Sequence, residues 1–204
     1  GRIAGGTGGA GDYALTCLCG NGGAGLVLTS GGMVLNTGTG TIEGGAGGSV
    51  GRDSAPRSGG AGIVATGNVG VTNAGTISGG LSGDGLTRAN AIDFSGSGNT
   101  LTLQSGYSFT GHVVSTSGTT RGGDTLALGG DVNPVDPFDV SNLVSNLSSS
   151  TTDTQFVGFA KFAKTGSSTW LLTGVGDSGM GDQVWTITDG ALQGAAINFG
   201  GDIR

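Results

Sequence analysis

Short runs of apolar and β-branched residues recur along the chain, with glycine, asparagine or threonine between them. In residues 59–80 these runs are Ile63-Val64, Val69-Gly70-Val71 and Thr76-Ile77-Ser78. Each run is too short for a helix, and alternate residues of an extended chain point to opposite sides. The pattern therefore predicts short β-strands, each with one buried face.

The strand pattern is repeated. Residues 22–45 match residues 59–80 at an offset of 37, which places Asn36 on Asn73. After a two-residue insertion at 39–40, residues 41–45 match residues 76–80. Strands that keep their register while loops vary are typical of a solenoid. A period of 37 residues would correspond to about two coils of three short strands each.

A third copy is looser. Residues 100–103 fall on residues 68–71, and residues 108–111 fall on residues 76–79, both at an offset of 32. Alternation along all copies predicts an apolar interior. Its expected members are Ile63, Val69, Val71, Ile77, Ile92, Phe94, Leu101, Leu103, Phe109, Val113, Leu126 and Leu128. Asn36 and Asn73 fall at equivalent corners, where stacked asparagines can link coils through their side-chain amides.

Composition narrows the class of protein. Glycine makes up 48 of the 204 residues, proline only 3, and charged residues 11%. The absence of a Gly-X-Y period excludes collagen, and low charge with recurring valine, isoleucine and threonine argues against disorder. The net charge of −6, without basic clusters, argues against nucleic acid and anionic membrane surfaces as partners. No apolar run is long enough for a membrane-spanning helix, and no signal peptide opens the chain, which we take for a fragment of a longer protein.

Changes in amino-acid composition divide the chain into three parts. Residues 1–131 predict glycine-rich coils. Residues 132–154 contain two of the three prolines and no glycine, and they predict an inserted loop with one short helix. Residues 155–204 predict further coils with larger apolar side chains, which would form a stabilising cap. The cap residues are Phe156, Phe159, Trp170, Leu172, Trp185, Ile187 and Leu192.

The two cysteines, Cys17 and Cys19, are two residues apart. On a regular strand their Cα atoms would be about 6.6–6.8 Å apart, at the upper limit for a disulfide. The neighbouring glycines make a turn plausible, so a small disulfide loop and a pair of free thiols both remain open. His112 is the only histidine, and this argues against a metal site.

The last third of the chain resembles a known family. The motif Phe156-x-x-Phe159, then Lys164-Thr-Gly-x-x-Thr-Trp170-x-Leu-Thr-Gly, then Trp185-x-Ile-x-x-Gly-x-Leu192, is similar to the C-terminal autochaperone part of bacterial type Va autotransporter passengers. The upstream glycine-rich repeats are similar to those of AIDA-like adhesins. Together the two resemblances cover most of the chain except residues 132–154.

The resemblance implies a right-handed parallel β-helix that is exported through the outer membrane by a C-terminal β-barrel, absent from this sequence. It implies display on the bacterial cell surface, or release from it. From the motifs themselves we expect no catalysis and no cofactor. The expected function is adhesion or self-association, with a host surface or matrix component or another copy of the chain as partner. The alternative is a structural stalk that presents a more N-terminal functional domain.

Four other functions depend on weaker signals. Gly176-Asp177-Ser178-Gly179 matches the tetrapeptide around a serine-protease nucleophile, but its only candidate base, His112, is expected several coils away. Calcium-binding nonapeptides would need an aspartate where Thr100 stands. Polysaccharide cleavage needs converging carboxylates, whereas the aspartates here are scattered over turns. Ice binding would need threonines ranked on one face through all coils, which the sequence does not indicate.

Overall fold

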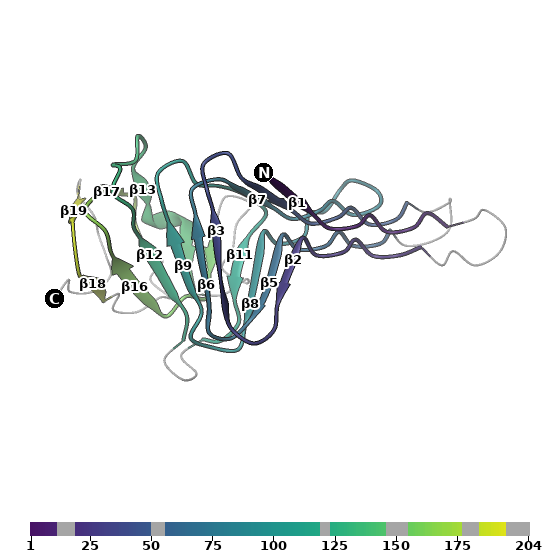
Figure 1. Ribbon diagram of the computed structural model, residues 1–204, viewed down its shortest axis with the longest axis horizontal. Helices are drawn as coiled ribbons and strands as arrows, with labels where there is room; N and C mark the ends of the chain where they lie inside the picture. Colours follow the sequence, from purple (N-terminus) through teal and green to yellow (C-terminus); the bar gives the residue numbers. More distant parts are fainter. Residues whose placement is uncertain (12–18, 50–55, 119–122, 146–154, 177–183, 195–204) are drawn as a thin grey trace.

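The computed structural model describes residues 1–11, 19–49, 56–118, 123–145, 155–176 and 184–194. Within these ranges the regular elements are β-strands and one short 3-10 helix, η2 (Val140–Asn142), and all pairing between strands is parallel. The expected all-β class is therefore confirmed, as is the parallel arrangement of its sheets (Figure 1).

The strands form four sheets, which we name A to D. Sheet A contains β1 (Arg2–Ala4), β4 (Thr41–Glu43), β7 (Thr76–Ser78) and β10 (Ser108–Thr110). Sheet B contains β2 (Leu26–Leu28), β5 (Ile63–Thr66), β8 (Ile92–Ser95), β11 (Val113–Ser115), β15 (Phe156–Val157) and β14 (Leu143–Val144), in that spatial order. Sheet C contains β3 (Gly32–Asn36), β6 (Val69–Asn73), β9 (Thr100–Leu103), β12 (Thr125–Leu128), β16 (Lys161–Lys164) and β18 (Trp185–Ile187). Sheet D contains β13 (Phe138–Asp139), β17 (Thr169–Thr173) and β19 (Ala191–Gly194).

The chain visits the sheets in turn. Each passage through sheet B, then sheet C, then sheet A or D is called a circuit below. Within each sheet, strands of successive circuits pair with one another, whereas β10 of sheet A and β13 of sheet D do not pair. Neighbouring strands in such a ladder are about 4.8 Å apart. Equivalent residues of successive circuits therefore lie directly over one another, and one inward position is repeated down the whole stack.

The register of the first two copies agrees with the sequence match, because Asn36 pairs with Asn73 and Ile42 pairs with Ile77. Two expectations were wrong. The 37-residue period is one circuit, not two, because part of it leaves the strands altogether. In sheet C the third copy is shifted: Leu101 pairs with Val71, at an offset of 30 instead of 32.

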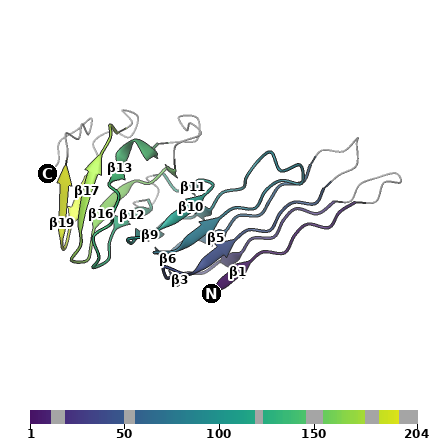
Figure 2. The same ribbon diagram turned by 90° about the horizontal axis from the view of Figure 1, so that it is seen from above.

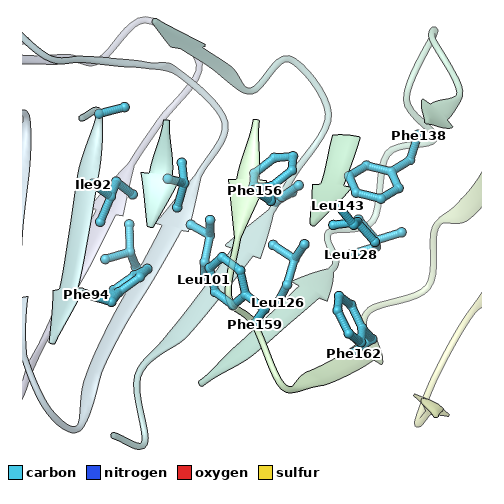
Figure 3. Packing of buried hydrophobic residues seen from close by; sticks show 14 of the residues in the cluster. Ile92, Phe94, Leu101, Leu126, Leu128, Phe138, Leu143, Phe156, Phe159 and Phe162 are labelled. Atoms are coloured by element: carbon cyan, nitrogen blue, oxygen red, sulfur yellow. The ribbon is translucent and has the colours of Figure 1, made fainter. Parts of the chain in front are cut away.

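The interior is apolar from the second circuit onward. Inward side chains such as Ile63, Phe94 and Leu126 have no exposed surface. The later circuits contain larger rings, and Figure 3 shows Phe138, Phe156, Phe159 and Phe162 packed among aliphatic side chains. The first circuit is different, since Leu26, Leu28 and Val34 are only partly buried. The side chains of the first circuit are less buried because described strands cover them on one side only, whereas the following circuits have neighbours on both sides.

Residues 138–144 break the simple order of circuits. After β13 in sheet D, the chain passes through η2 to β14, which pairs with the far side of β15. The later strand β15 lies between β11 and the earlier strand β14, with Phe156 opposite both Val113 and Leu143. Within the predicted loop 132–154, the short helix is therefore a 3-10 turn, and a two-residue strand joins sheet B out of sequence. Residues 146–154 lie outside the described residues.

Glycine-rich segments extend away from the strands as wavy chains, seen beyond β1 in Figures 1 and 2. They connect sheet A to sheet B, and we call them the glycine arm. Its outgoing segments are 5–9, 44–48 and 79–83, and its returning segments are 20–25, 57–62 and 89–91. The excursions shorten along the chain, and the next connection from sheet A to sheet B is only Gly111-His112.

Hydrogen bonds in the arm follow a three-residue period. Gly44 donates to the carbonyl of Ser78 at the end of β7, and Gly47 donates to that of Leu81 in the next outgoing segment. Gly45 and Gly48 donate across to Gly23 and Gly20 of a returning segment. A three-residue repeat without bonds inside the segment is typical of polyproline II geometry. The arm is therefore a two-layer array of polyproline II-like segments, joined by backbone hydrogen bonds.

Close packing explains the glycines of the arm. A Cβ on Gly44 would clash with the carbonyl oxygen of Gly60, and one on Gly45 with that of Gly6. None of these glycines has a positive φ, so they are needed for space and not for an unusual backbone conformation. Two of every three residues face a neighbouring segment, which gives the local pattern Gly-Gly-x.

Candidate functional site

The outer face of sheet C presents two rows of side chains in register. The first row is Met33, Gly70, Thr100, Thr125 and Lys161, and the second is Leu35, Thr72, Thr102, Ala127, Ala163 and Thr186. Threonine hydroxyls are neighbours at two places, but alanine, glycine and the large side chains of Met33 and Leu35 interrupt both rows. This face is a regular array of short side chains at strand spacing, with an apolar end at the first circuit.

Sheet A has a second, shorter array. Its outward rows are Arg2, Thr41, Thr76 and Ser108, and Ala4, Glu43, Ser78 and Thr110. The Nη2 atom of Arg2 donates to Oε2 of Glu43 across the first two strands at 2.6 Å. Because both side chains are solvated, this ion pair contributes little to stability. The face of sheet A is polar and spans fewer circuits than that of sheet C.

The predicted corner asparagines lie between sheets C and A. Asn36 Nδ2 donates to Asn73 Oδ1 at 2.8 Å and to the carbonyl of Thr76 at 3.2 Å. Asn73 Oδ1 also accepts from the backbone of Gly75, while the buried Asn73 Nδ2 has no hydrogen-bond partner among the described residues. The next residue in this column is Leu103, which cannot continue the ladder. The asparagine pair therefore joins the first two circuits only.

A second polar corner, between sheets B and C, escaped the sequence analysis. The fully buried carboxylate of Asp124 accepts from the backbone and side-chain nitrogens of Asn99 at 2.9 and 3.1 Å, and from Ser115 Oγ at 2.8 Å. Asn99 Oδ1 in turn accepts from Val69 N at 3.1 Å. The available signal was a polar residue directly before β9 and before β12.

This corner bears on the calcium hypothesis. Donors surround the carboxylate of Asp124, whereas a cation would need further acceptors around it. Among the described residues, no group of three or more histidine, cysteine, aspartate or glutamate side chains could hold a metal ion. The corner is a structural link between three circuits.

The predicted cap residues lie in the last two circuits. Trp170 has no exposed surface, its Nε1 donates to the carbonyl of Gly129 at 3.2 Å, and its ring contacts Phe138 edge to face. Phe156, Phe159, Leu172 and Trp185 are also buried, and Leu192 is partly buried against the core. Ile187 is different: it is 51% exposed at the end of sheet C.

Lys164 is a buried cation in this region. Its Nζ donates to the carbonyl oxygens of Thr165 at 2.7 Å, Gly166 at 2.6 Å and Asp189 at 3.2 Å. Burial lowers the pKa of Lys164, and the carboxylates of Asp189 and Asp131 act in the opposite direction. The ammonium group thus links the turn after β16 to the turn before β19.

Tyr107 stacks on Trp170, with ring centroids 6.1 Å apart, where sheet A ends and sheet D begins. Burial, with a smaller contribution from the carboxylate of Asp136, raises the pKa of Tyr107 to about 12. Phe109 meets Phe156 edge to face at 5.8 Å. Aromatic contacts therefore bridge the place where β10 and β13 do not pair.

Several predicted site residues lie outside the described residues. Ser178 and Asp177 are among them, so the protease hypothesis has no geometry to examine; His112 is half-buried between β10 and β11. Cys17 is another. Cys19 is buried and disulfide-bonded, but because Cys17 is not described, the pairing of the two stays a prediction.

No protein-family model matches this chain, and neither does any curated protein or solved structure. In the described part of the chain, no helix has the length and apolar character needed to cross a membrane.

Proposed function

We propose that the chain is a non-catalytic adhesive module, a right-handed parallel β-helix displayed on a bacterial surface as part of an autotransporter passenger. The motif around Trp170 and Trp185 resembles the autochaperone part of autotransporter passengers, and this resemblance supports the proposal that the chain belongs to that family. The parallel sheets, in which equivalent residues of successive circuits are stacked, are compatible with a parallel β-helix. Partners would be a host surface or matrix component, or a second copy of the chain.

The observation that carries the adhesive function is the array on sheet C. In its second row, short side chains repeat at about 4.8 Å through five strands, from Thr72 on β6 to Thr186 on β18, with threonine hydroxyls available for hydrogen bonds to a partner. Each contact would be weak. Many copies displayed on one cell would convert weak contacts into firm attachment, since avidity can exceed single-site affinity by roughly 10²–10⁴.

Attachment of coated beads to epithelial cells tests this function. Beads that carry the whole chain should bind at least 100-fold more tightly than the soluble chain, because only the beads bind multivalently. The double variant Thr72→Glu/Thr102→Glu should reduce bead attachment at least tenfold. The matched variant Thr41→Glu/Thr76→Glu, on sheet A, should leave attachment unchanged.

Two results would count against the proposal. Equal loss in both variants would show that added charge, and not the sheet C face, controls attachment. If the beads bind no cell or matrix surface, adhesion to a partner other than a second copy of the chain is excluded. The second candidate function, a stalk that presents a more N-terminal domain, would then gain support from the unbroken ladders of sheets B and C.

A further inference from the structure

The outward side chains of sheet C are small from β6 to β16. Apart from one lysine on β16, these positions hold only glycine, alanine or threonine: Gly70, Thr72, Thr100, Thr102, Thr125, Ala127, Lys161 and Ala163. Interfaces with proteins usually depend on a few large aromatic or apolar side chains at their centre. The described outward positions of these four strands hold none, so the face is poorly suited to a protein partner.

Four hydroxyl groups lie close together on this face. Thr72 pairs with Thr102, and Thr100 pairs with Thr125, on strands that are about 4.8 Å apart. Thr100 and Thr102 are both on β9, about 6.6 Å apart along the strand. Among the described residues, no hydrogen bond engages any of the four hydroxyls. Each hydroxyl can therefore donate one hydrogen bond to a ligand and accept others, as sugar hydroxyls also do.

The two rows cross the strands, so they run along the stack of circuits (Figure 1). A ligand that meets successive threonines must therefore be long and must repeat at the spacing of the strands. The sugar rings of an extended, cellulose-like polysaccharide repeat at an interval close to the strand spacing of about 4.8 Å. The positions without a hydroxyl, at Gly70, Ala127 and Ala163, leave room for such rings to lie close to the sheet.

Lys161 is the only charged residue in the two described outward rows of sheet C, and its exposed side chain is next to Thr125. Neither row contains a carboxylate, although the net charge of the chain is −6. The carboxylate of Asp124, just before β12, is fully buried and accepts from Asn99 and Ser115. Because salt screens exposed charges beyond about 8 Å, the local positive charge matters more to a ligand on this face than the net charge does.

We infer that the face of sheet C from β6 to β16 binds a linear polysaccharide that carries carboxylates. The inference rests on the proposed function, because it names the partner of the same face. The sugar chain lies across the strands, with its hydroxyls bonded to the threonines and a carboxylate paired with the ammonium group of Lys161. Each of these bonds is exposed to water and weak, so firm binding needs several sugar units and many displayed chains.

Beads coated with the whole chain, binding to immobilised carboxymethyl cellulose, test the inference. Hydroxyethyl cellulose is the matched probe, because it has the same backbone without the charge. Wild type should bind the charged polymer at least tenfold more tightly than the uncharged one. Lys161→Gln should abolish this preference, whereas Arg57→Gln, which removes an exposed arginine of the glycine arm, should retain it.

A second pair of variants tests the hydroxyl groups. Thr100→Val/Thr102→Val keeps the shape of both side chains and removes their hydroxyls, so binding to both polymers should weaken at least tenfold. The matched variant Thr41→Val/Thr76→Val, on the outward face of sheet A, should bind both polymers as wild type does. Circular dichroism melting should show that all four variants fold like wild type.

The inference fails if wild type binds the two polymers equally, or if Lys161→Gln and Arg57→Gln weaken binding to the same extent. Unchanged binding by Thr100→Val/Thr102→Val would also overturn it. A protein partner has a different signature: beads attach to epithelial cells, soluble carboxymethyl cellulose does not compete, and protease treatment of the cells abolishes attachment. If that attachment is still sensitive to Thr72→Glu/Thr102→Glu, the inference is overturned while the proposed function stands.

Discussion

Lys164 shows how a single residue can join two turns. Its ammonium group has no exposed surface and is held by three backbone carbonyls instead of a carboxylate. The neighbouring Gly190 has a φ of +70°, and a Cβ there would lie 2.5 Å from Lys164 Nζ. The lysine and the glycine after Asp189 therefore depend on each other, which explains why a charged residue occupies an inward position of β16.

We expect Lys164→Met to lower the free energy of unfolding by roughly 1.5–3 kcal/mol, because hydrogen bonds to a charged donor are lost and their carbonyls stay buried. Urea unfolding measures this change. Lys161→Met, on the same strand with an exposed side chain, is the control and should change stability by less than about 0.5 kcal/mol. Equal effects would mean that the ammonium bonds contribute nothing specific.

Tyr107 predicts a dependence on pH. Its pKa of about 12 in the folded chain exceeds the value of roughly 10 expected when unfolded, because burial disfavours the phenolate. The contribution of the neutral Tyr107 phenol to the free energy of unfolding is therefore complete below pH 10 and is lost as the pH rises towards 12. The loss is at most about 2.7 kcal/mol. In urea unfolding at pH 9 and 11.5, Tyr107→Phe should lose less stability than wild type does.

At the scale of the element, the glycine arm illustrates packing without side chains. The segments of the arm pack this closely only because glycine lets carbonyl oxygens approach the facing Cα atoms. The sequence signal was present as Gly5-Gly-Thr-Gly-Gly9 and Gly44-Gly-Ala-Gly-Gly48. From these residues the sequence predicts only glycine-rich coils, because a period of two glycines in three residues carries no alternation of apolar side chains.

The arm makes a sharp prediction about alanine. Gly44→Ala should destabilise the chain by roughly 1–3 kcal/mol or more, since its Cβ would overlap the carbonyl of Gly60 and force the segments apart. Gly6→Ala, with open space at the Cβ position, should change stability by less than about 0.5 kcal/mol. Thermal unfolding followed by circular dichroism distinguishes the two. Similar melting of both variants would contradict the close-packed arm.

At the scale of the molecule, the order of strands in sheet B links distant parts of the chain. Strand β15 separates β11 from β14, so β14 has no described partner in sheet B until the chain that follows it has returned. The later circuits therefore depend on one another for folding. Their aromatic cluster of Phe109, Phe138, Phe156 and Trp170 adds to this dependence, because each ring contacts a residue of another circuit.

Phe156→Ala should therefore act beyond its own strand. We expect a loss of roughly 3–5 kcal/mol, with faster amide hydrogen exchange in both β11 and β14, because Phe156 pairs with Val113 and Leu143. Leu171→Ala, on the exposed side of β17, is the control and should leave exchange in sheet B unchanged. Faster exchange confined to β15 would show that β14 is held by other contacts.

Alternation and repetition in the sequence are enough to define the strands and their inner faces. Alternation identified Ile63, Phe94 and Leu101 as interior residues because a strand has a fixed period of two, and the repeat identified Asn36 and Asn73 as neighbours. The sequence did not determine the register of the third copy in sheet C. A register shift of two residues preserves the inward face, so the pairing of Leu101 with Val71 could not be distinguished from its alternative.

Tertiary structure alone decided where the residues between the strands go. Glycine backbones carry no pattern of apolar side chains, so their association depends on hydrogen bonds between segments remote in sequence. The same applies to Asp124, which is buried against Asn99 of the preceding circuit and Ser115 of β11, and to β14, whose partner follows it in the chain. Long-range pairing of this kind leaves little local signal in the sequence.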